Sequence, residues 1–190
     1  MNFFITSDTH GHLEKVYDMY DKLKDMTIDG KPIDGLIHCG DNKRDGETLG
    51  ERLGLPAWSV AGNCDGGMRK DIGIVSTPWC SILVTHGHMQ GVDWDLSSLT
   101  YLAEEKDCSI ACFGHTHVPV FEKVGKITVV NPGSLSFPRD GTGGSCALLN
   151  VTDKGCDGGI YYYDNLFGSR KKKHARGGFL RSVINYSDGF

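Results

Sequence analysis

The feature that most constrains the fold is a series of short apolar runs that read as strands and end in polar motifs. Five runs end in such motifs, in chain order: 2–7 in TSDTHGH, 35–39 in CGDN, 57–61 in AGNCD, 80–85 in THGH and 109–113 in FGHTH. Apolar residues recur at helical spacing in 12–25 and 95–106, and more weakly in 47–53. Strands that alternate with helices predict parallel βαβ units, whose strand ends share one edge of a sheet. We therefore expect the five motifs to converge on one crevice.

The later part of the chain has a different pattern. Strand-like runs at 118–124, 127–131, 145–151 and 159–164 follow one another without a helical segment, which predicts an antiparallel meander. The class is therefore α/β with mixed sheets. A length of 190 residues fits one core, and the Gly/Lys/Arg-rich stretch near 167–178 is the only candidate boundary. We predict a domain over 1–165 and a basic C-terminal extension over 166–190.

Composition narrows the setting of the protein. The seven cysteines are odd in number and contain no CxxC pair, which argues against a disulfide framework and a structural zinc site. MNFFITSD lacks the pattern of a secretory signal, and no apolar stretch approaches the roughly 20 residues that span a bilayer. We expect a cytoplasmic protein with no membrane partner.

Charge is distributed unevenly along the chain. Six of the 20 basic residues lie in the last 21 positions, opposed there only by Asp188, although the net charge is −4. Such a tail is either an arm that binds polyanions, including nucleic acid, or a solvated surface segment.

The histidines supply the first sign of chemistry. Six of the eight form pairs at i and i+2, namely His10 with His12, His86 with His88 and His115 with His117. If a segment is extended, residues at i and i+2 face the same side, so Asp8 with His10 and His115 with His117 can each present two ligands to one side. With the carboxylates and amide of the other motifs, the potential ligands are Asp8, His10, Asp41, Asn63, His86, His115 and His117. Oxygen and imidazole donors suit Mn, Fe, Zn or Ni, and seven ligands fit two ions bridged by one carboxylate.

DTH, GDN, GNCD, THGH and GHTH, in this order, resemble the motifs of the calcineurin-like metallophosphoesterases, and GNCD with the later NPGS resembles the small YfcE-like phosphodiesterase branch. The resemblance spans residues 8–134. It implies a four-layer α-β-β-α sandwich of two mixed sheets flanked by helices, and two divalent metal ions. We expect Mn²⁺ first, with Ni²⁺, Zn²⁺, Fe²⁺ and Mg²⁺ as alternatives.

Carried over by position, the resemblance assigns ligands to each ion. Asp8, His10 and His117 would hold the first ion, Asn63, His86 and His115 the second, and Asp41 would bridge them. The resemblance also places the Asn131–Ser134 turn near the site. We interpret His88 as a phosphate contact or a structural residue, Arg139 as a phosphate contact or a surface ion-pair partner, and His38 as structural.

The expected function is hydrolysis of a small phosphodiester by a hydroxide that bridges the two ions, with Asp41, Asn63 and His88 as catalytic residues and Asn63, His88 and Arg139 as substrate contacts. Larger phosphatases of the superfamily carry a histidine after the asparagine, where this chain has Cys64. The group that protonates the leaving oxygen is thus open, which favours diesters.

Several different functions stay open at this point. Cys64 could be a nucleophile, although that leaves seven metal-type residues without a role. The same site could serve a phosphomonoesterase or a nuclease recruited by the basic tail. A non-catalytic scaffold, like the retromer subunit of this fold, is a further possibility. The natural substrate and the oligomeric state, a homo-oligomer included, are also open.

Overall fold

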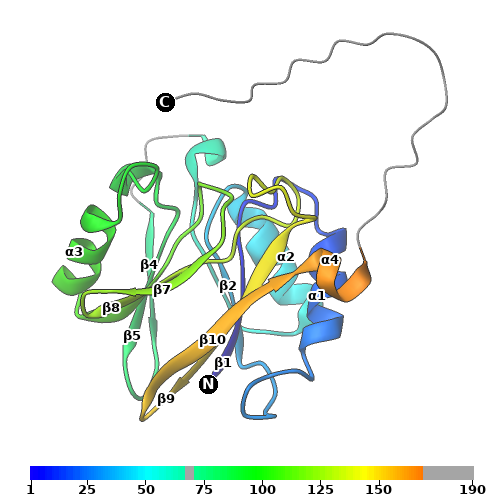
Figure 1. The fold of residues 1–190 in the computed structure, drawn as a ribbon, viewed down its shortest axis with the longest axis horizontal. Helices are drawn as coiled ribbons and strands as arrows, with labels where there is room; N and C mark the ends of the chain where they lie inside the picture. Colours follow the sequence, from blue (N-terminus) through cyan, green and yellow to red (C-terminus); the bar gives the residue numbers. More distant parts are fainter. Residues whose placement is uncertain (67–70, 169–190) are drawn as a thin grey trace, which may run out of the picture.

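The computed structural model describes residues 1–66 and 71–168, which form two five-stranded sheets (Figure 1). The first sheet contains, in spatial order, β10 (Gly155–Tyr162), β9 (Ser145–Thr152), β1 (Asn2–Thr6), β2 (Gly35–His38) and β3 (Ala57–Ser59). The second contains β4 (Ile72–Ser76), β5 (Ser81–Thr85), β6 (Cys108–Cys112), β8 (Ile127–Asn131) and β7 (Val120–Val124). Parallel and antiparallel neighbours occur in both, so both sheets are mixed.

Side-chain alternation in β1 explains how the sheets are layered. Phe3 and Ile5 lie in a buried cluster with Ile82 and Val84 of β5, between the two sheets. Phe4 points the other way, into a cluster with residues of α1 (Glu14–Leu23) and α2 (Lys43–Leu53).

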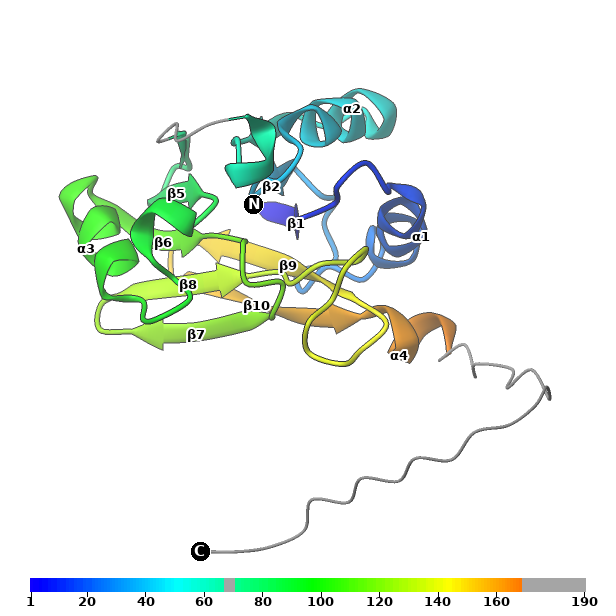
Figure 2. The same ribbon diagram turned by 90° about the horizontal axis from the view of Figure 1, so that it is seen from above.

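A third apolar cluster joins the second sheet to α3 (Ser97–Glu105) through Leu83, Leu99 and Ala103. Figures 1 and 2 show α1 and α2 on one side of the two sheets and α3 on the other. The predicted α-β-β-α sandwich is therefore confirmed.

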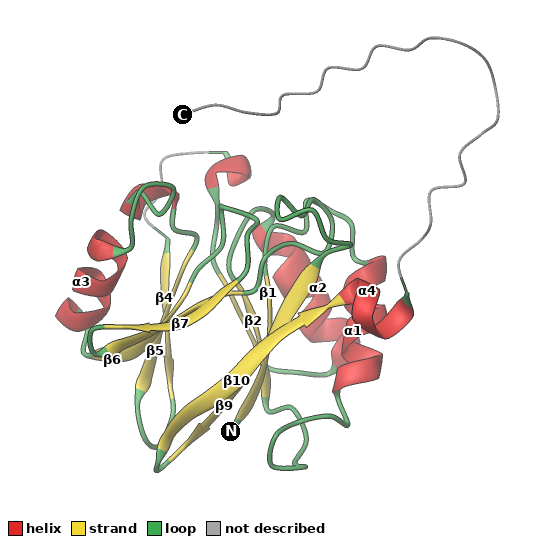
Figure 3. Ribbon diagram, viewed as in Figure 1, coloured by secondary structure: helices red, strands yellow, loops and turns green. Residues whose placement is uncertain are grey.

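Parallel pairing brings the strand ends together. β1, β2 and β3 are parallel neighbours, with Thr6 opposite His38 and His38 opposite Ser59 at their carboxyl ends. β5 and β6 are parallel as well, with Val84 opposite Cys112. The loops that leave these five strands gather along the upper edge in Figure 3.

Three details of the predicted element order were wrong. β4 was not predicted, and it lies between the third and fourth ligand-bearing strands. The predicted meander is two separate hairpins, because β9 and β10 pair in the first sheet while β7 and β8 pair in the second. The predicted strand at 159–164 ends earlier, because α4 (Tyr163–Phe167) follows it.

Most of the C-terminal extension predicted over 166–190 lies outside the described residues, and the boundary proposed at 165/166 falls within α4. In the described part of the chain, no helix has the length and apolar character that crossing a membrane requires. All seven cysteines are free thiols, and Cys39, Cys108, Cys112 and Cys146 are buried.

Candidate metal centre

The five strand-end loops bring the predicted ligands to one place, which we call the candidate metal centre. It comprises Asp8, His10, Asp41, Asn63, His86, His115 and His117. Four of these, Asp8, His10, Asp41 and His117, each offer a ligand atom within 4.8 Å of the others. Asn63 begins a short 3-10 turn over Asn63–Asp65, and His86 directly follows β5. This cluster confirms the predicted convergence for the loops after β1, β2 and β6. The contacts of Asn63 and His86, described below, confirm it for the loops after β3 and β5.

The backbone reaches this arrangement in a way that the sequence argument did not anticipate. Seven non-glycine residues of the described chain have positive φ, and five belong to the centre: Asp8 (54°), His10 (47°), Asp41 (54°), His115 (70°) and His117 (58°). The loops are therefore not extended, so strand alternation does not orient these residues, although Asp8 and His10 do present ligand atoms to the same cluster. Left-handed backbone at non-glycine residues costs about 1–3 kcal/mol each and gathers at functional sites.

Two histidines are oriented by bonds on the far side of their rings. His86 Nδ1 lies 2.8 Å from the carbonyl oxygen of Cys39, and His117 Nδ1 lies 2.6 Å from that of Phe137. A carbonyl can only accept, so Nδ1 carries a proton in both rings, and Nε2, which faces the carboxylates, is the atom that would bind a metal ion after losing its own proton. His117 Nε2 lies 3.2 Å from Asp8 Oδ1, and His86 Nε2 lies 3.3 Å from Asp41 Oδ1.

The carboxylate of Asp8 is buried yet keeps its charge. Burial by itself raises the pKa of Asp8, but the hydrogen bond with His117 and the charge of His86 outweigh burial and lower it below its usual value. The same contact raises the pKa of His117, against the lowering effect of burial. Asp8 also accepts the backbone N–H of His115, at 3.1 Å to Oδ2.

Asp41 separates the centre into two halves. Its Oδ2 lies 3.6 Å from His10 Nε2, whereas its Oδ1 lies 3.3 Å from His86 Nε2. Oδ1 also accepts the backbone N–H of Cys64 at 3.0 Å. Asn63 Oδ1 lies 3.0 Å from His86 Nε2, on the same side. Each carboxylate oxygen thus faces a different group of potential ligands.

Glycines allow the loops to approach these carboxylates. A Cβ at Gly62 would overlap the Oδ1 atom and backbone nitrogen of Asp41, and one at Gly114 would overlap Ser7 and the carboxylate of Asp8. Gly62 of GNCD and Gly114 of GHTH are therefore needed because any side chain there would overlap the carboxylates of Asp41 and Asp8.

Asp93 was not identified from the sequence, although it contacts the centre. Its Oδ2 lies 2.8 Å from His115 Nε2, and half of its side chain is exposed. Because a carboxylate accepts, the bond places a proton on Nε2 and leaves Nδ1 of His115 as the potential ligand atom. Asp93 lies outside the five motifs, and no spacing rule marks it.

Asp65 is a second residue whose role only the structure shows. Its carboxylate accepts three backbone N–H groups, from Gly62 at 2.7 Å, Lys43 at 2.9 Å and Asn42 at 3.0 Å. Burial raises the pKa of Asp65, but these bonds outweigh it and the pKa is lowered. Asp65 thereby ties the turn that carries Asn63 to the loop that carries Asp41.

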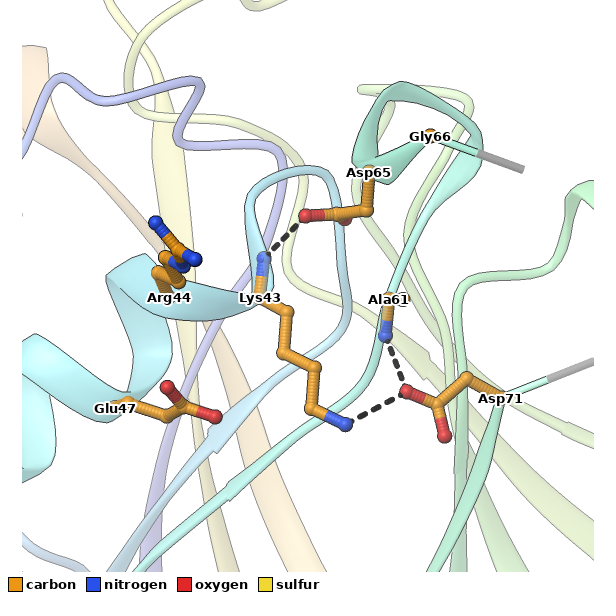
Figure 4. Close-up of a pocket in the computed structure, with 7 residues that line it drawn as sticks. All are labelled: Lys43, Arg44, Glu47, Ala61, Asp65, Gly66 and Asp71. Atoms are coloured by element: carbon orange, nitrogen blue, oxygen red, sulfur yellow. Dashed lines mark hydrogen bonds and ion pairs between the residues drawn. The ribbon is translucent and has the colours of Figure 1, made fainter. Parts of the chain in front are cut away.

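A polar pocket of about 720 Å³ adjoins this turn (Figure 4). It is lined by Lys43, Arg44, Glu47, Ala61, Asp65, Gly66 and Asp71. Figure 4 shows the Asp65 carboxylate against the Lys43 amide, and the Asp71 carboxylate 2.9 Å from Lys43 Nζ and 2.8 Å from the Ala61 amide. The pocket is polar and lies outside the centre itself.

The Asn131–Ser134 turn does lie against the centre, as the resemblance implied. Asn131 Nδ2 donates to the Gly114 carbonyl at 2.9 Å, and Ser134 Oγ donates to the Asp8 carbonyl at 2.9 Å. Arg139 is exposed, and its backbone N–H donates to the His117 carbonyl at 3.2 Å.

His88 lies beside the centre with neither ring nitrogen bonded to the described protein, although both atoms are buried. Its ring centroid is 5.3 Å from that of His86 and 6.0 Å from that of His115. A buried imidazole without a protein partner is costly unless a ligand or water completes it.

Cys64 has the wrong electrostatics for a nucleophile. Burial first, and then the hydrogen bond and charge of Asp41, raise the pKa of its thiol to about 11. A nucleophilic cysteine needs the opposite shift. Arg69, which could have supported a cysteine loop, lies outside the described residues.

Comparison with known proteins gives the same family as the motifs. The calcineurin-like phosphoesterase superfamily domain matches residues 1–154. Probable metallophosphoesterase YsnB of Bacillus subtilis is 34% identical over 165 residues, 86% of this chain and 91% of that protein. Phosphodiesterase YfcE of Escherichia coli is 29% identical over 170 residues, 79% of this chain and 88% of that protein.

Among solved structures, a predicted phosphoesterase of Streptococcus pneumoniae superposes with a TM-score of 0.68 at 29% identity, covering 86% of this chain and 90% of that one. The chain therefore belongs to the calcineurin-like phosphoesterase superfamily.

Proposed function

We propose that the protein is a binuclear metal-dependent phosphodiesterase. The observation that carries the proposal is the position of Asp41, whose two oxygens face His10 at 3.6 Å and His86 at 3.3 Å. A carboxylate with one oxygen directed to each of two donor groups has the arrangement needed to bridge two cations.

The donor chemistry fits such ions. Asp8, His10 and His117 would hold one ion with Asp41, and Asn63, His86 and His115 the other. The set contains oxygen and imidazole donors and no thiolate, which suits Mn²⁺, our first choice, and also Ni²⁺, Zn²⁺, Fe²⁺ or Mg²⁺. Bonds that orient His86, His117 and His115 from the far side of each ring are typical of metal-ligating histidines.

When bound, two divalent ions would lower the pKa of a shared water towards neutrality and offset negative charge on the phosphate. The protein's own groups would orient the substrate. Asn63 has an amide N–H₂ to donate to a phosphate oxygen while its Oδ1 faces His86. The unpartnered ring of His88 would donate a second hydrogen bond, and Arg139 is a third substrate contact that we propose.

The leaving group sets the preferred substrate class. Cys64 stands where larger phosphatases place a histidine, so this position lacks the imidazole that could protonate the leaving oxygen near neutral pH. Substrates whose leaving oxygen needs little protonation would react fastest. Among the relatives, YfcE is named a phosphodiesterase, which supports the same choice.

The direct test compares bis(p-nitrophenyl) phosphate with p-nitrophenyl phosphate, after chelation and then with Mn²⁺, Ni²⁺, Zn²⁺ or Mg²⁺ restored. We expect chelation to abolish hydrolysis, a restored ion to return it, and the diester to be preferred. Full activity in chelator would contradict the metal requirement. A clear preference for the monoester would make the protein a phosphatase.

A scaffold and a nuclease would give different results. Binding of two ions without hydrolysis of either ester would indicate a scaffold of the same fold. A nuclease would require salt-sensitive binding of DNA or RNA that deletion of 167–190 abolishes. The cytoplasmic location stays a prediction.

A further inference from the structure

A small cavity lies on the His10 side of the candidate metal centre, and different loops build it from those that build the polar pocket of Figure 4. Its volume is about 280 Å³, and it is lined by His12, Glu14, Lys15, Leu135, Ser136 and Phe137. These residues come from the loop after β1, the first turn of α1 and the chain that follows the Asn131–Ser134 turn.

Phe137 is the notable member of this lining, because it is a large apolar residue that is 47% exposed beside the centre. The ring centroid lies 5.3 Å from that of His10 and 5.5 Å from that of His12, both in edge contacts. Its carbonyl accepts His117 Nδ1 at 2.6 Å, and its amide donates to Ser134 Oγ at 2.9 Å. An exposed ring is thus held on a fixed backbone, in direct contact with the potential ligand His10.

The charges in the cavity restrict what it can bind. Lys15 Nζ donates to the Gly143 carbonyl at 2.6 Å and lies 5.0 Å from the centroid of the Tyr163 ring, so the lysine is already engaged. Glu14 is exposed and adds a negative charge. The cavity is therefore unfavourable for a second phosphate, and it suits a neutral planar group, especially one with an amino group that can donate to Glu14.

Size points in the same direction. Pockets that enclose a whole small molecule usually measure roughly 300–1,000 Å³, so a cavity of about 280 Å³ suits one ring system of a larger substrate. Its neighbour, the candidate metal centre, is where the phosphate of that substrate would lie.

We propose that this cavity binds the nucleobase of a nucleotide substrate, with the base against the ring of Phe137. The position of the phosphate rests on the proposed phosphodiesterase function, whereas the contact with the base does not. Phe137 is then a specificity-determining residue, and bases that carry an exocyclic amino group, such as adenine, are favoured over uracil and thymine, which lack one.

The test measures binding, so that it is independent of turnover. AMP and ribose 5-phosphate carry the same phosphate and sugar, but only AMP carries a base. Calorimetric titration in Mn²⁺ should show AMP binding about 10-fold more tightly than ribose 5-phosphate, because only AMP carries a base that can stack on the aromatic ring. Phe137→Ala should remove this advantage and leave ribose 5-phosphate within about 2-fold of the wild type.

Two variants make the result specific. Phe137→Leu keeps a large apolar side chain but removes the aromatic ring, so it should also weaken AMP binding. It provides the test if the alanine variant fails to fold. Trp79→Ala removes another aromatic side chain that is 47% exposed, on the turn between β4 and β5 at the end of β5 remote from His86. It should leave both affinities unchanged.

Equal affinity of the wild type for the two ligands would overturn the inference, and so would AMP binding that Phe137→Ala leaves intact. If Phe137→Ala weakened the binding of AMP and of ribose 5-phosphate equally, the inference would also be overturned, because Phe137 would then act on the phosphate site. Base-dependent binding without hydrolysis of either nitrophenyl ester would support the inference and contradict the proposed phosphodiesterase function instead.

Discussion

The two halves of the candidate metal centre differ in how they are held. On the Oδ2 side of Asp41, Asp8 and His117 are 0% and 5% exposed, and the four potential ligands lie within 4.8 Å of one another. On the Oδ1 side, Asn63 is exposed on a three-residue turn, and His115 is bonded through Nε2 to the half-exposed Asp93. Three of the four potential ligands on the Oδ2 side, Asp8, Asp41 and His117, are therefore buried, whereas His86 is the one buried ligand on the Oδ1 side, where Asp65 and Asp93 brace the loops of the other two. We therefore expect the first ion to bind more tightly than the second.

Asp41→Asn should break both halves together, because each half faces a different oxygen of Asp41. Loss of a charged bridging ligand costs several kcal/mol, which corresponds to a fall in kcat of about 1,000-fold or more. Turnover of bis(p-nitrophenyl) phosphate and the number of bound ions, measured by mass spectrometry under native conditions, check this. Near-normal turnover would show that Asp41 does not bridge.

Acid should lower the free energy of unfolding through His38, which bonds to the loop that carries Asp8 and His10. This buried ring donates from Nε2 to Thr9 Oγ1 at 2.9 Å, and Thr9 lies between Asp8 and His10 and donates in turn to Asp45 at 2.6 Å. Burial lowers the pKa of His38 to about 4. The unfolded chain therefore takes up this proton first, so the contribution of His38 is complete above about pH 6.5 and is lost as the pH falls towards 4.

The expected loss is about 3 kcal/mol of unfolding free energy across the whole window, of which about 2 kcal/mol falls between pH 7 and pH 5. Urea unfolding at pH 7 and pH 5 measures it, with His38→Gln as the matched variant that keeps an N–H donor and cannot titrate. The free energy of unfolding should depend less on pH in His38→Gln. An unchanged pH dependence would show that His38 is not the group that titrates.

Asp65→Asn should separate the two halves. The amide cannot accept three backbone N–H groups as the carboxylate does, so the turn that carries Asn63 should loosen from the Asp41 loop. Loss of such an outer support typically weakens metal binding by about 10–100-fold. We expect this loss for the weaker ion only, in a Mn²⁺ titration followed by calorimetry.

Asp164→Asn is the matched control, because Asp164 also braces a loop, accepting the Gly143 N–H at 2.8 Å, but lies outside the centre. It should lower stability without selective loss of one ion. If Asp65→Asn weakened both ions equally, the two halves would not be held independently.

Cys64→Ser should have the smallest effect. The backbone N–H of residue 64, which bonds to Asp41 at 3.0 Å, is retained in serine, and the thiol carries no charge to lose. Diesterase activity should stay within about 3-fold of the wild type, since neutral exposed substitutions rarely shift free energies by more than about 0.5 kcal/mol. A loss as large as that of Asn63→Ala would restore Cys64 as a nucleophile.

Much of the fold could be predicted, because most strands are continuous apolar runs and α1 and α3 keep helical spacing. β4 could not, since its sequence includes Gly73, and Val75 is its only fully buried side chain. The sequence also did not reveal that α2 begins at Lys43, four residues before the predicted start at residue 47. Its first turn has no apolar periodicity and is fixed by close packing, because a Cβ at Gly46 would overlap Ser59 and His38.

For the candidate metal centre, residue type and order were enough to identify the available ligands, their donor chemistry and their place at the ends of strands that parallel pairing aligns. Tertiary structure decided everything that depends on contacts between distant loops. Left-handed backbone at Asp8, His10, Asp41, His115 and His117 replaces the predicted alternation. The bracing by Asp65 and Asp93, and the exposed ring of Phe137 beside His10, have no local signal. The physical reason is that residue type and spacing describe one segment at a time, whereas this site is built from loops that only the two packed sheets bring together.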